Sequence, residues 1–372
     1  MKIAYLFTYG YSLTTWKNSG TLDKELRVFR KLHEKYGFKF KLFTYGDDKD
    51  LLIRIDEEIF EVFPIYTFTT LYNLKVLNYI KSFYLPFLIS KEFKDVSLIK
   101  QNQLQGVWVS VILKFILKKP LYTRTGYDVL KFSRHSKNSY LKIFIYYLLT
   151  QIAIISSNIY SVTSNSDYIF LRKYFFGTKN IMIRPNWIEN NRTTDLDMRI
   201  KNKVISVGRL EKQKNYKKLI SIFEGSNFEI DIAGEGSLKT ELENFAKIKG
   251  VKVNFIGRLE NQDILKLLND YLFYFSTSDY EGNPKSVLEA MSCGCIVFLS
   301  NIENHKELVS NGINGYILEY PFEINTLLNE ILDDSTKISN ISDNSLSSIV
   351  DNNSLEILTT KLYGDFIALI DC

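Results

Sequence analysis

The chain opens with an apolar run, an amphipathic segment and a second apolar run, joined by short polar links. In the middle segment, 22–37, large apolar residues recur at the spacing of one helix face, and Gly37 ends it. A strand, a helix and a strand with such short links predict a parallel pair, because parallel strands need a crossover between them. Later strands of the same sheet are expected at 95–102, 118–126 and 158–165.

The most apolar stretch, 141–160, is interrupted by Lys142, Thr150 and Gln151. A membrane-spanning helix needs about 20 consecutive apolar residues, so a buried helix running into a strand is expected here, with a membrane span as the alternative. The first residues show neither the apolar core nor the small-residue cleavage site of a secretory signal.

The pattern changes after Pro185. Segment 186–202 is polar and lacks periodicity, and a second series of strands and helices begins at Lys203. The polar stretch 333–353 is expected to be a loop or linker, and 354–370 an amphipathic helix. The expected parts are an N-terminal domain, a hinge, a C-terminal domain and a terminal helix on the first domain, at 1–185, 186–202, 203–350 and 351–372.

Composition fits two soluble domains with ordinary cores. The chain has 372 residues, of which 45% are hydrophobic. Its three cysteines, Cys293, Cys295 and Cys372, do not make a disulfide framework, which indicates a reducing cytoplasm.

Charge is distributed unevenly along the chain. Residues 1–185 carry a net charge of +14 and residues 186–372 carry −9. A basic half suggests an anionic partner, and an anionic bilayer surface or a lipid diphosphate suits it best. No nucleic-acid partner is expected, since the chain has no RNA-binding aromatic motif and no zinc-finger spacing. The alternative is a solvated basic surface without a partner.

The strongest chemical signal is the run STSDYEGNPKSVLEAMSCG, 276–294. It follows an aromatic-rich strand, turns at Glu281, and opens a helix at Pro284 that carries Glu289 and stops at Gly294. The N–H groups at such a helix start attract phosphate, and the two carboxylates can accept hydrogen bonds from sugar hydroxyls. This predicts a sugar-nucleotide site, with a surface helix bearing two solvated glutamates as the alternative.

A second phrase, VISVGRLEKQKNY, spans 204–216. Its strand ends at Gly208, where a ligand can approach the backbone, and Arg209 and Lys214 follow five positions apart. Both cations can converge on one anion. Two unrelated surface cations are the alternative.

Together the two phrases resemble the donor-site signature of the retaining family-4 glycosyltransferases, the glycosyl transferases group 1. The resemblance implies the α/β GT-B fold, with two Rossmann-like domains facing across a cleft and a terminal helix crossing back to the first domain. It implies that Glu281 lies by the donor sugar, that Glu289 holds the ribose, and that Arg209 and Lys214 grip the diphosphate. The other donor-binding residues expected from it are Gly20, Gly208, Gly234, Gly236, Arg258, Gly282, Asn283, Pro284, Lys285 and Ser286.

The phrase TRTGYD, 123–128, departs from the family. Family members often carry a histidine where Thr125 stands, and a threonine cannot hold a positive charge. Arg124, Asp128 or Lys100 could compensate, and Arg124, Thr125 and Asp128 are the expected acceptor-side residues. His135 could reach the acceptor, although a solvated loop histidine is the alternative, while His305 is expected to be structural.

No metal and no cofactor are expected. Two Asp-x-Asp pairs, Asp48/Asp50 and Asp195/Asp197, resemble metal-binding pairs of another glycosyltransferase fold. Neither accompanies a donor phrase, so both are interpreted as accidental. Arg209, Lys214 and the helix start would supply the charge that a metal supplies elsewhere.

The sequence therefore predicts a retaining glycosyltransferase that moves a hexose-type sugar from a nucleotide diphosphate sugar to a glycan or lipid-linked acceptor. Its expected setting is bacterial surface polysaccharide assembly, in the cytoplasm or peripherally at the inner face of the membrane. A non-catalytic sugar-nucleotide-binding protein of the same fold is the alternative. A Rossmann oxidoreductase is disfavoured, because no Gly-x-Gly-x-x-Gly follows the first strand.

Overall fold

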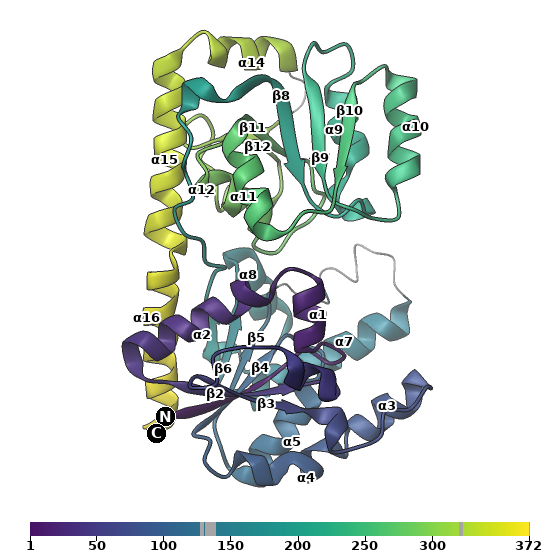
Figure 1. Cartoon of the computed structure of the whole chain (residues 1–372), viewed down its shortest axis with the longest axis vertical. Helices are drawn as coiled ribbons and strands as arrows, with labels where there is room; N and C mark the ends of the chain where they lie inside the picture. The colour runs from purple at the N-terminus through teal and green to yellow at the C-terminus, as the bar shows by residue number, and fades with distance from the viewer. Residues whose placement is uncertain (127–129, 131–138, 320–322, 372) are drawn as a thin grey trace. The chain divides into compact units, whose positions relative to one another are not determined.

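The chain folds into two compact units, as seen in a computed structural model that describes every residue except 127–129, 131–138, 320–322 and 372. Residues 1–185 and 356–372 form the first unit, and residues 186–355 form the second (Figure 1). The segment 186–202, expected as a hinge, lies within the second unit. The chain thus leaves the first unit once, builds the second, and returns to the first with its last helix.

The first unit is built on a parallel sheet of seven strands in the order β3-β2-β1-β4-β5-β6-β7. The register of β1 beside β2 and β4 places their carboxyl ends at one edge. The strands are β1 (Lys2–Leu6), β2 (Lys39–Thr44), β3 (Phe60–Pro64), β4 (Leu98–Asn102), β5 (Leu121–Arg124), β6 (Ile159–Val162) and β7 (Ile181–Ile183).

Helices cover both faces of this sheet. On one face, α2 (Leu22–Tyr36) packs Phe29 against Phe40 of β2, and α16 (Leu355–Ile370) packs Phe366 against Tyr122 of β5. The opposite face holds a single core shared by four helices. These are α4 (Leu85–Ile89), α5 (Val107–Leu117), α7 (Tyr140–Ser156) and α8 (Asn165–Tyr174).

Several elements of the first unit are absent from the sequence prediction. The loop after β1 contains α1 (Leu13–Asn18), capped by Ser12, so Ser19 and Gly20 follow a helix rather than the first strand directly. The short edge strand β3 adds to β2 in parallel register. Another short helix that was not predicted, α3 (Lys75–Ser82), precedes α4.

The terminal helix α16 is fixed to the first unit by polar and aromatic contacts. Arg184, just after β7, donates from Nε to Asp365 Oδ2 at 2.8 Å. The ring of Tyr363 stacks on Tyr36 with centroids 3.9 Å apart. The expected return of the terminal helix to the first domain is therefore confirmed.

The second unit contains a parallel sheet of six strands in the order β10-β9-β8-β11-β12-β13. The second series of strands and helices that is expected from Lys203 onward is present. They are β8 (Ile200–Val207), β9 (Glu229–Ala233), β10 (Val253–Gly257), β11 (Tyr271–Ser276), β12 (Ile296–Ser300) and β13 (Tyr316–Leu318).

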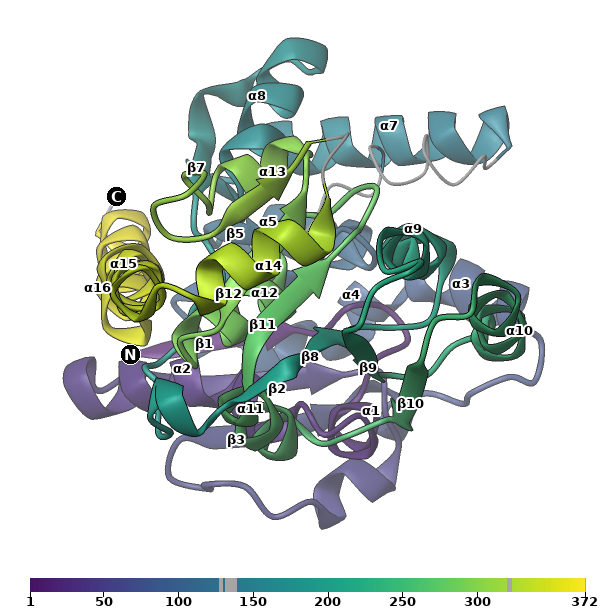
Figure 2. The same ribbon diagram turned by 90° about the horizontal axis from the view of Figure 1, so that it is seen from above.

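Two sets of helices cover the second sheet. One core lies beneath α9 (Tyr216–Ile222), α10 (Lys239–Lys249) and α14 (Ile324–Leu332). The other lies beneath α11 (Asn261–Asp270), α12 (Lys285–Ser292) and the C-terminal part of α15 (Ser335–Asn353). Figure 2 shows α9 and α10 on one side of the strands and α11 on the other.

The expectation of a loop at 333–353 is wrong, because this segment forms α15. Its buried positions Ile338, Ile341, Ser345 and Ile349 recur at helical spacing despite the polar composition. Ser342 also faces inward and donates its hydroxyl to the carbonyl of Gly294 at 2.7 Å. A helix with so few large apolar residues is stable here because α12 packs closely against it.

Candidate active site

The order of the second sheet brings the predicted donor residues to one edge. Strands β10, β9, β8 and β11 are neighbours, and all are parallel. Their carboxyl ends are followed by Arg258, Gly234, Gly208 and Glu281 respectively. Residues separated by more than 70 positions in sequence therefore lie on adjacent loops, as expected of a ligand site in an open α/β sheet.

The glycines of this edge allow the loop after β9 to pack on the loop after β8. A Cβ on Gly234, whose φ is +151°, would lie 2.0 Å from the carbonyl oxygen of Gly208. A Cβ on Gly236 would lie 2.4 Å from the carbonyl oxygen of Leu210. The two loops are also joined by a hydrogen bond from Leu210 N to Glu235 O at 2.9 Å. These two glycines are thus required by chain packing, whatever else they contact.

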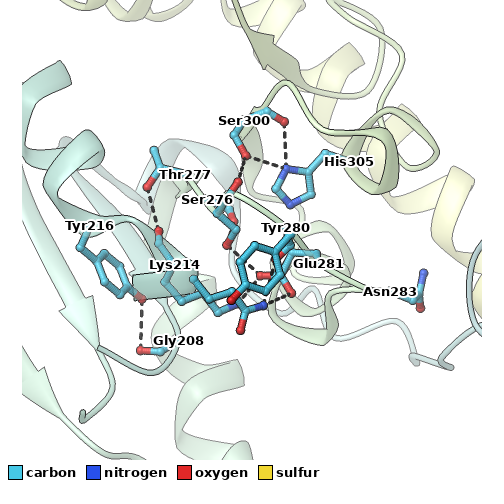
Figure 3. Close-up of polar contacts among 12 residues, drawn as sticks. Gly208, Lys214, Tyr216, Ser276, Thr277, Tyr280, Glu281, Asn283, Ser300 and His305 are labelled. Carbon is cyan, nitrogen blue, oxygen red and sulfur yellow. Dashed lines mark hydrogen bonds and ion pairs between the residues drawn. The ribbon is translucent and has the colours of Figure 1, made fainter. Parts of the chain in front are cut away.

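The centre of the site is an ion pair between Lys214 and Glu281. Lys214 Nζ lies 2.6 Å from Glu281 Oε1, and the two side chains are 17% and 8% exposed. Glu281 also accepts from Ser278 Oγ at 2.7 Å and from Gln213 Nε2 at 3.3 Å (Figure 3). The carboxylate is thereby held in one orientation. A lysine ammonium has three N–H donors, so this pair leaves Lys214 with donors for an anion.

Further hydrogen bonds join the two loops that carry this pair. Thr277 Oγ1 donates to the carbonyls of Lys214 and Asn215 at 3.2 and 3.1 Å. Asn215 Nδ2 donates to Asp279 Oδ1 at 2.8 Å, and Asp279 N donates to Gln213 O at 2.9 Å. Asn215 adopts a positive φ of 45°, which asparagine tolerates better than most residues. The segments 213–215 and 277–281 therefore behave as one rigid support.

Arg209 differs from Lys214 in making no ion pair with any residue that the structure describes. Its side chain is exposed, and within the described part of the chain it makes no side-chain hydrogen bond and no ion pair. It directly follows Gly208, whose carbonyl accepts from the Tyr216 hydroxyl at 3.1 Å. The end of β8 thus presents an uncompensated guanidinium beside a neutralised lysine–glutamate pair.

The helix start after Glu281 differs in detail from the prediction. Pro284 occupies the N-cap, and α12 begins at Lys285 rather than at the proline. Asn283 Oδ1 accepts from Asn186 N at 2.9 Å, and Asn283 O accepts from Asn186 Nδ2 at 2.8 Å. Asn283 accordingly lies apart from the Lys214–Glu281 pair and joins the segment 186–202 to the site loop (Figure 3). Gly282 is buried in this turn, and Ser286 lies half-buried in the first turn of the helix.

Glu289 is buried on α12 and accepts a hydrogen bond from Asn261 Nδ2 at 2.9 Å. Asn261 is the first residue of α11 and follows the loop that carries the exposed Arg258. The sequence prediction missed Asn261, because it lies 28 positions from Glu289 and no sequence pattern links the two. The hydrogen bond from the Asn261 amide fixes the position of the Glu289 carboxylate near the carboxyl edge of the sheet.

A buried histidine is linked to Glu281 through two serines. His305 is 0% exposed, and its Nδ1 lies 3.0 Å from Ser300 O. Because a carbonyl only accepts, Nδ1 carries the hydrogen and Nε2 has the lone pair. Ser300 Oγ donates to Ser278 O at 2.5 Å, and Ser278 donates to Glu281 (Figure 3). Burial lowers the pKa of His305 to about 4, although the bond to Ser300 and the charge of Glu281 act in the opposite direction.

The acceptor-side residues and Gly20 all belong to the first unit. Arg124 ends β5, and Thr125 is buried with its N–H donating to Ser161 O at 2.8 Å. Gly20, with φ +67°, lies between α1 and α2. Asp128 and His135 lie outside the described residues.

Two further predicted residues have clear structural environments. Asp50 is 1% exposed and accepts from Leu13 N, Thr14 N and Thr44 Oγ1, so its carboxylate anchors the start of α1. Lys100 is buried, with its ammonium 4.7 Å from the ring centre of Tyr5, and burial lowers the pKa of Lys100 to about 7.

Comparison with known proteins adds to this description. Residues 195–347 match the sequence model of the family described as Glycosyl transferases group 1. This range contains every predicted donor residue except Gly20. The chain is 27% identical over 266 residues, 70% of each chain, to a Campylobacter jejuni protein. That protein is named GalNAc-alpha-(1->4)-GalNAc-alpha-(1->3)-diNAcBac-PP-undecaprenol alpha-1,4-N-acetyl-D-galactosaminyltransferase.

Solved structures resemble the whole chain. Sucrose-phosphate synthase from Thermosynechococcus elongatus superposes with a TM-score of 0.78 at 15% identity and covers 99% of both chains. The HepE protein of Anabaena, crystallised with UDP, gives a TM-score of 0.75 at 17% identity, covering 99% of this chain and 100% of the other. At these identities the likeness concerns the fold, and it confirms the expected two-domain GT-B architecture.

Proposed function

We propose that the protein is a glycosyltransferase that takes its sugar from a nucleotide diphosphate sugar. The observation that carries this proposal is the arrangement at the carboxyl edge of the second sheet. There the exposed Arg209 follows β8 beside the Lys214–Glu281 pair, and the start of α12 follows the same loop. The family match over 195–347 and the relative that transfers N-acetylgalactosamine support the same reaction class.

The proposed roles follow from the charges of these groups. Arg209 offers a planar fork that suits a diphosphate, and Lys214 adds a second cation. Both would offset the negative charge that builds on the nucleotide diphosphate as the glycosidic bond breaks. Glu281, held by three donors, would orient the sugar hydroxyls, and Glu289 with Asn261 would hold the ribose.

The finer reaction is also a proposal. We propose retention of anomeric configuration: the acceptor hydroxyl attacks on the face that the diphosphate vacates, and the departing phosphate takes its proton. The donor is proposed to carry a hexose-type sugar, and no metal would be needed because the two cations supply the charge. The acceptor would be a glycan or a lipid-linked glycan of a bacterial surface polysaccharide, since the name of the Campylobacter relative gives an undecaprenol-linked acceptor.

A binding protein that has kept the fold but lost transfer is the second candidate. Thr125 favours it, because this side chain is buried, is bonded within the sheet and cannot hold a positive charge. Thermal-shift screening with uridine and guanosine diphosphate sugars would identify the donor under either candidate, since a bound ligand stabilises the fold. Transfer to lipid extracts would then separate the enzyme from the binding protein.

Replacing Arg209 tests the catalytic assignment. With the donor identified, Arg209→Ala is expected to lower kcat/KM by roughly 100-fold or more, as for other preorganised groups that stabilise transition-state charge. The matched control is Lys217→Ala, which removes an exposed cation paired with Glu241 on the next helix and should change the rate less than about twofold. Equal activity of the two variants would refute the role of Arg209.

A further inference from the structure

Helix α7 presents an apolar face to solvent, contrary to the buried helix expected from its composition. Seven of its large apolar side chains are exposed, from Leu148 at 43% to Tyr140 at 92%, and they are Tyr140, Leu141, Phe144, Ile145, Leu148, Ile152 and Ile155. At 100° per residue all seven fall within an arc of about 140°, over a length of roughly 22 Å. Phe176, 76% exposed, lies beside them because its backbone bonds the side chain of Gln151 on α7.

A second group of exposed apolar residues surrounds α3. They come from α3, the loop before it and the start of α4, and they are Leu71, Tyr72, Leu74, Val76, Leu77, Tyr79, Ile80, Phe83, Tyr84 and Phe87. Five of the ten are aromatic, and three of these are tyrosines, a residue type that favours the boundary between water and lipid. Monomeric soluble proteins rarely expose apolar residues in such numbers side by side.

The two groups belong to one helical layer of the first unit. Helix α3 packs on α4, α4 on α5, and α5 on α7, so the layer continues from one group to the other. The inner sides of α4, α5 and α7 share the core on one face of the first sheet. We call the exposed side chains of α3 and α7, with those of the loop before α3, the α3–α7 surface. Figure 1 labels the two helices.

The segments that carry the α3–α7 surface are strongly basic. Residues 62–91 contain three lysines and no acidic residue, and residues 96–166 contain nine basic residues and one acid, Asp128. Lys75 and Lys142 are exposed in α3 and α7 themselves, and Lys118 is exposed just after α5. Apolar side chains interleaved with lysines are suited to a partner whose surface combines hydrocarbon with negative charge. Pairing with a second copy would instead bring like charges together, because a two-fold interface apposes the same patch on both subunits.

We propose that the α3–α7 surface docks on an anionic lipid bilayer. Its aromatic and aliphatic side chains enter the headgroup region while the lysines contact lipid phosphates. Within the part of the chain that the structure describes, no helix combines the length and the apolarity needed to cross a bilayer. The proposed docking combines two signals, apolar insertion and charge, as stable surface binding requires. The proposal does not depend on glycosyl transfer.

Sedimentation with vesicles tests this surface without any sugar nucleotide. The native protein is expected to bind vesicles of phosphatidylglycerol and phosphatidylcholine in equal parts at least tenfold more tightly than vesicles of phosphatidylcholine alone. The triple variant Leu141→Ser, Phe144→Ser, Leu148→Ser should lose roughly tenfold or more of this affinity. Its matched control replaces three exposed apolar residues of the second unit, Met198→Ser, Ile248→Ser and Ile313→Ser, and should bind as the native protein does.

Two results would overturn the proposal. One is equal vesicle binding by the triple variant and the native protein. The other is a native protein that ignores both vesicles but self-associates in analytical ultracentrifugation, with the triple variant monomeric, which would assign the surface to a second copy. Circular dichroism of both triple variants checks that each remains folded, as expected when only exposed side chains change.

Discussion

At the scale of single residues, the buried imidazole of His305 is linked by hydrogen bonds to the turn that carries Glu281. Its Nε2 has no hydrogen-bond partner within the described part of the chain, so protonation there would place an unpaired charge in the core. The chain of bonds from His305 through Ser300 and Ser278 to Glu281 means that such a charge would disturb the carboxylate as well.

The pH dependence of stability should therefore report His305. Its folded pKa of about 4 is lower than the ordinary 6.5, so between these values the unfolded chain binds the extra proton. Stability is expected to fall by about 3 kcal/mol as the pH drops through this window, and the contribution is fully present above pH 6.5. Urea unfolding of the native protein and of His305→Gln at pH 7.5, 6 and 4.5 would measure it. The half-buried His33→Gln serves as control, and an unchanged slope in His305→Gln would contradict the assignment.

The residues with sequence signals were easier to predict than their partners. Arg209, Lys214, Glu281 and Glu289 follow strand ends or lie on a helix with recognisable boundaries, so local pattern located them. Gln213, Ser278 and Asn261 hold those side chains in place, but their pairing depends on the strand order β10-β9-β8-β11. Local sequence does not determine that order, which is why these three were missed.

At the scale of elements, α15 illustrates how polar composition can hide a helix. Serine and asparagine dominate 333–353, and the prediction followed composition rather than the regular spacing of the isoleucines. The strands of 204–318 and the helices α9, α10, α11 and α12 were expected, because each has a strong apolar period and a clear glycine or polar boundary, whereas α13 (Glu303–Lys306) and α14 were not. In α7 the prediction of a helix is confirmed but that of burial is wrong, since a helix apolar on all sides carries no signal for which face is covered.

Two buried serines of α15 allow a matched test of its packing. Ser342 and Ser345 are both fully buried, but only Ser342 has a hydroxyl partner, the carbonyl of Gly294. Ser342→Ala is expected to cost about 1–2 kcal/mol of unfolding free energy, because it leaves a buried carbonyl unsatisfied. Ser345→Ala should be neutral or stabilising by up to about 1 kcal/mol. Chemical denaturation of both variants decides this, and equal losses would show that the bond to Gly294 contributes little.

At the scale of the whole molecule, the first unit is made from two separate parts of the sequence. Residues 356–372 belong to it although 170 residues of the second unit intervene. The buried pair between Arg184 and Asp365 joins the two parts, with side chains 15% and 8% exposed. Desolvation acts against the charge of Arg184, but the hydrogen bond to Asp365 outweighs it and raises the pKa of Arg184.

Breaking this pair should destabilise the first unit specifically. Asp365→Ala leaves a largely buried guanidinium without its counter-charge and is expected to cost about 3–5 kcal/mol. Glu356 lies on the same helix as Asp365, and Glu356→Ala removes an exposed ion pair with Lys35 of α2, which should cost less than about 1 kcal/mol. Calorimetry would separate the transitions of the two units, and similar melting of both variants would contradict the importance of the buried pair.

The discontinuous first unit also has a consequence for synthesis on the ribosome. A nascent chain that has reached residue 355 holds the complete second unit, whereas the first still lacks the helix that covers Phe38 and Tyr122. Folding from the N-terminus onward, the usual order in multidomain proteins, is thus interrupted here. Until residues 356–372 are synthesised, the first unit has part of its core exposed. During that interval the first unit, rather than the second, needs protection by a chaperone.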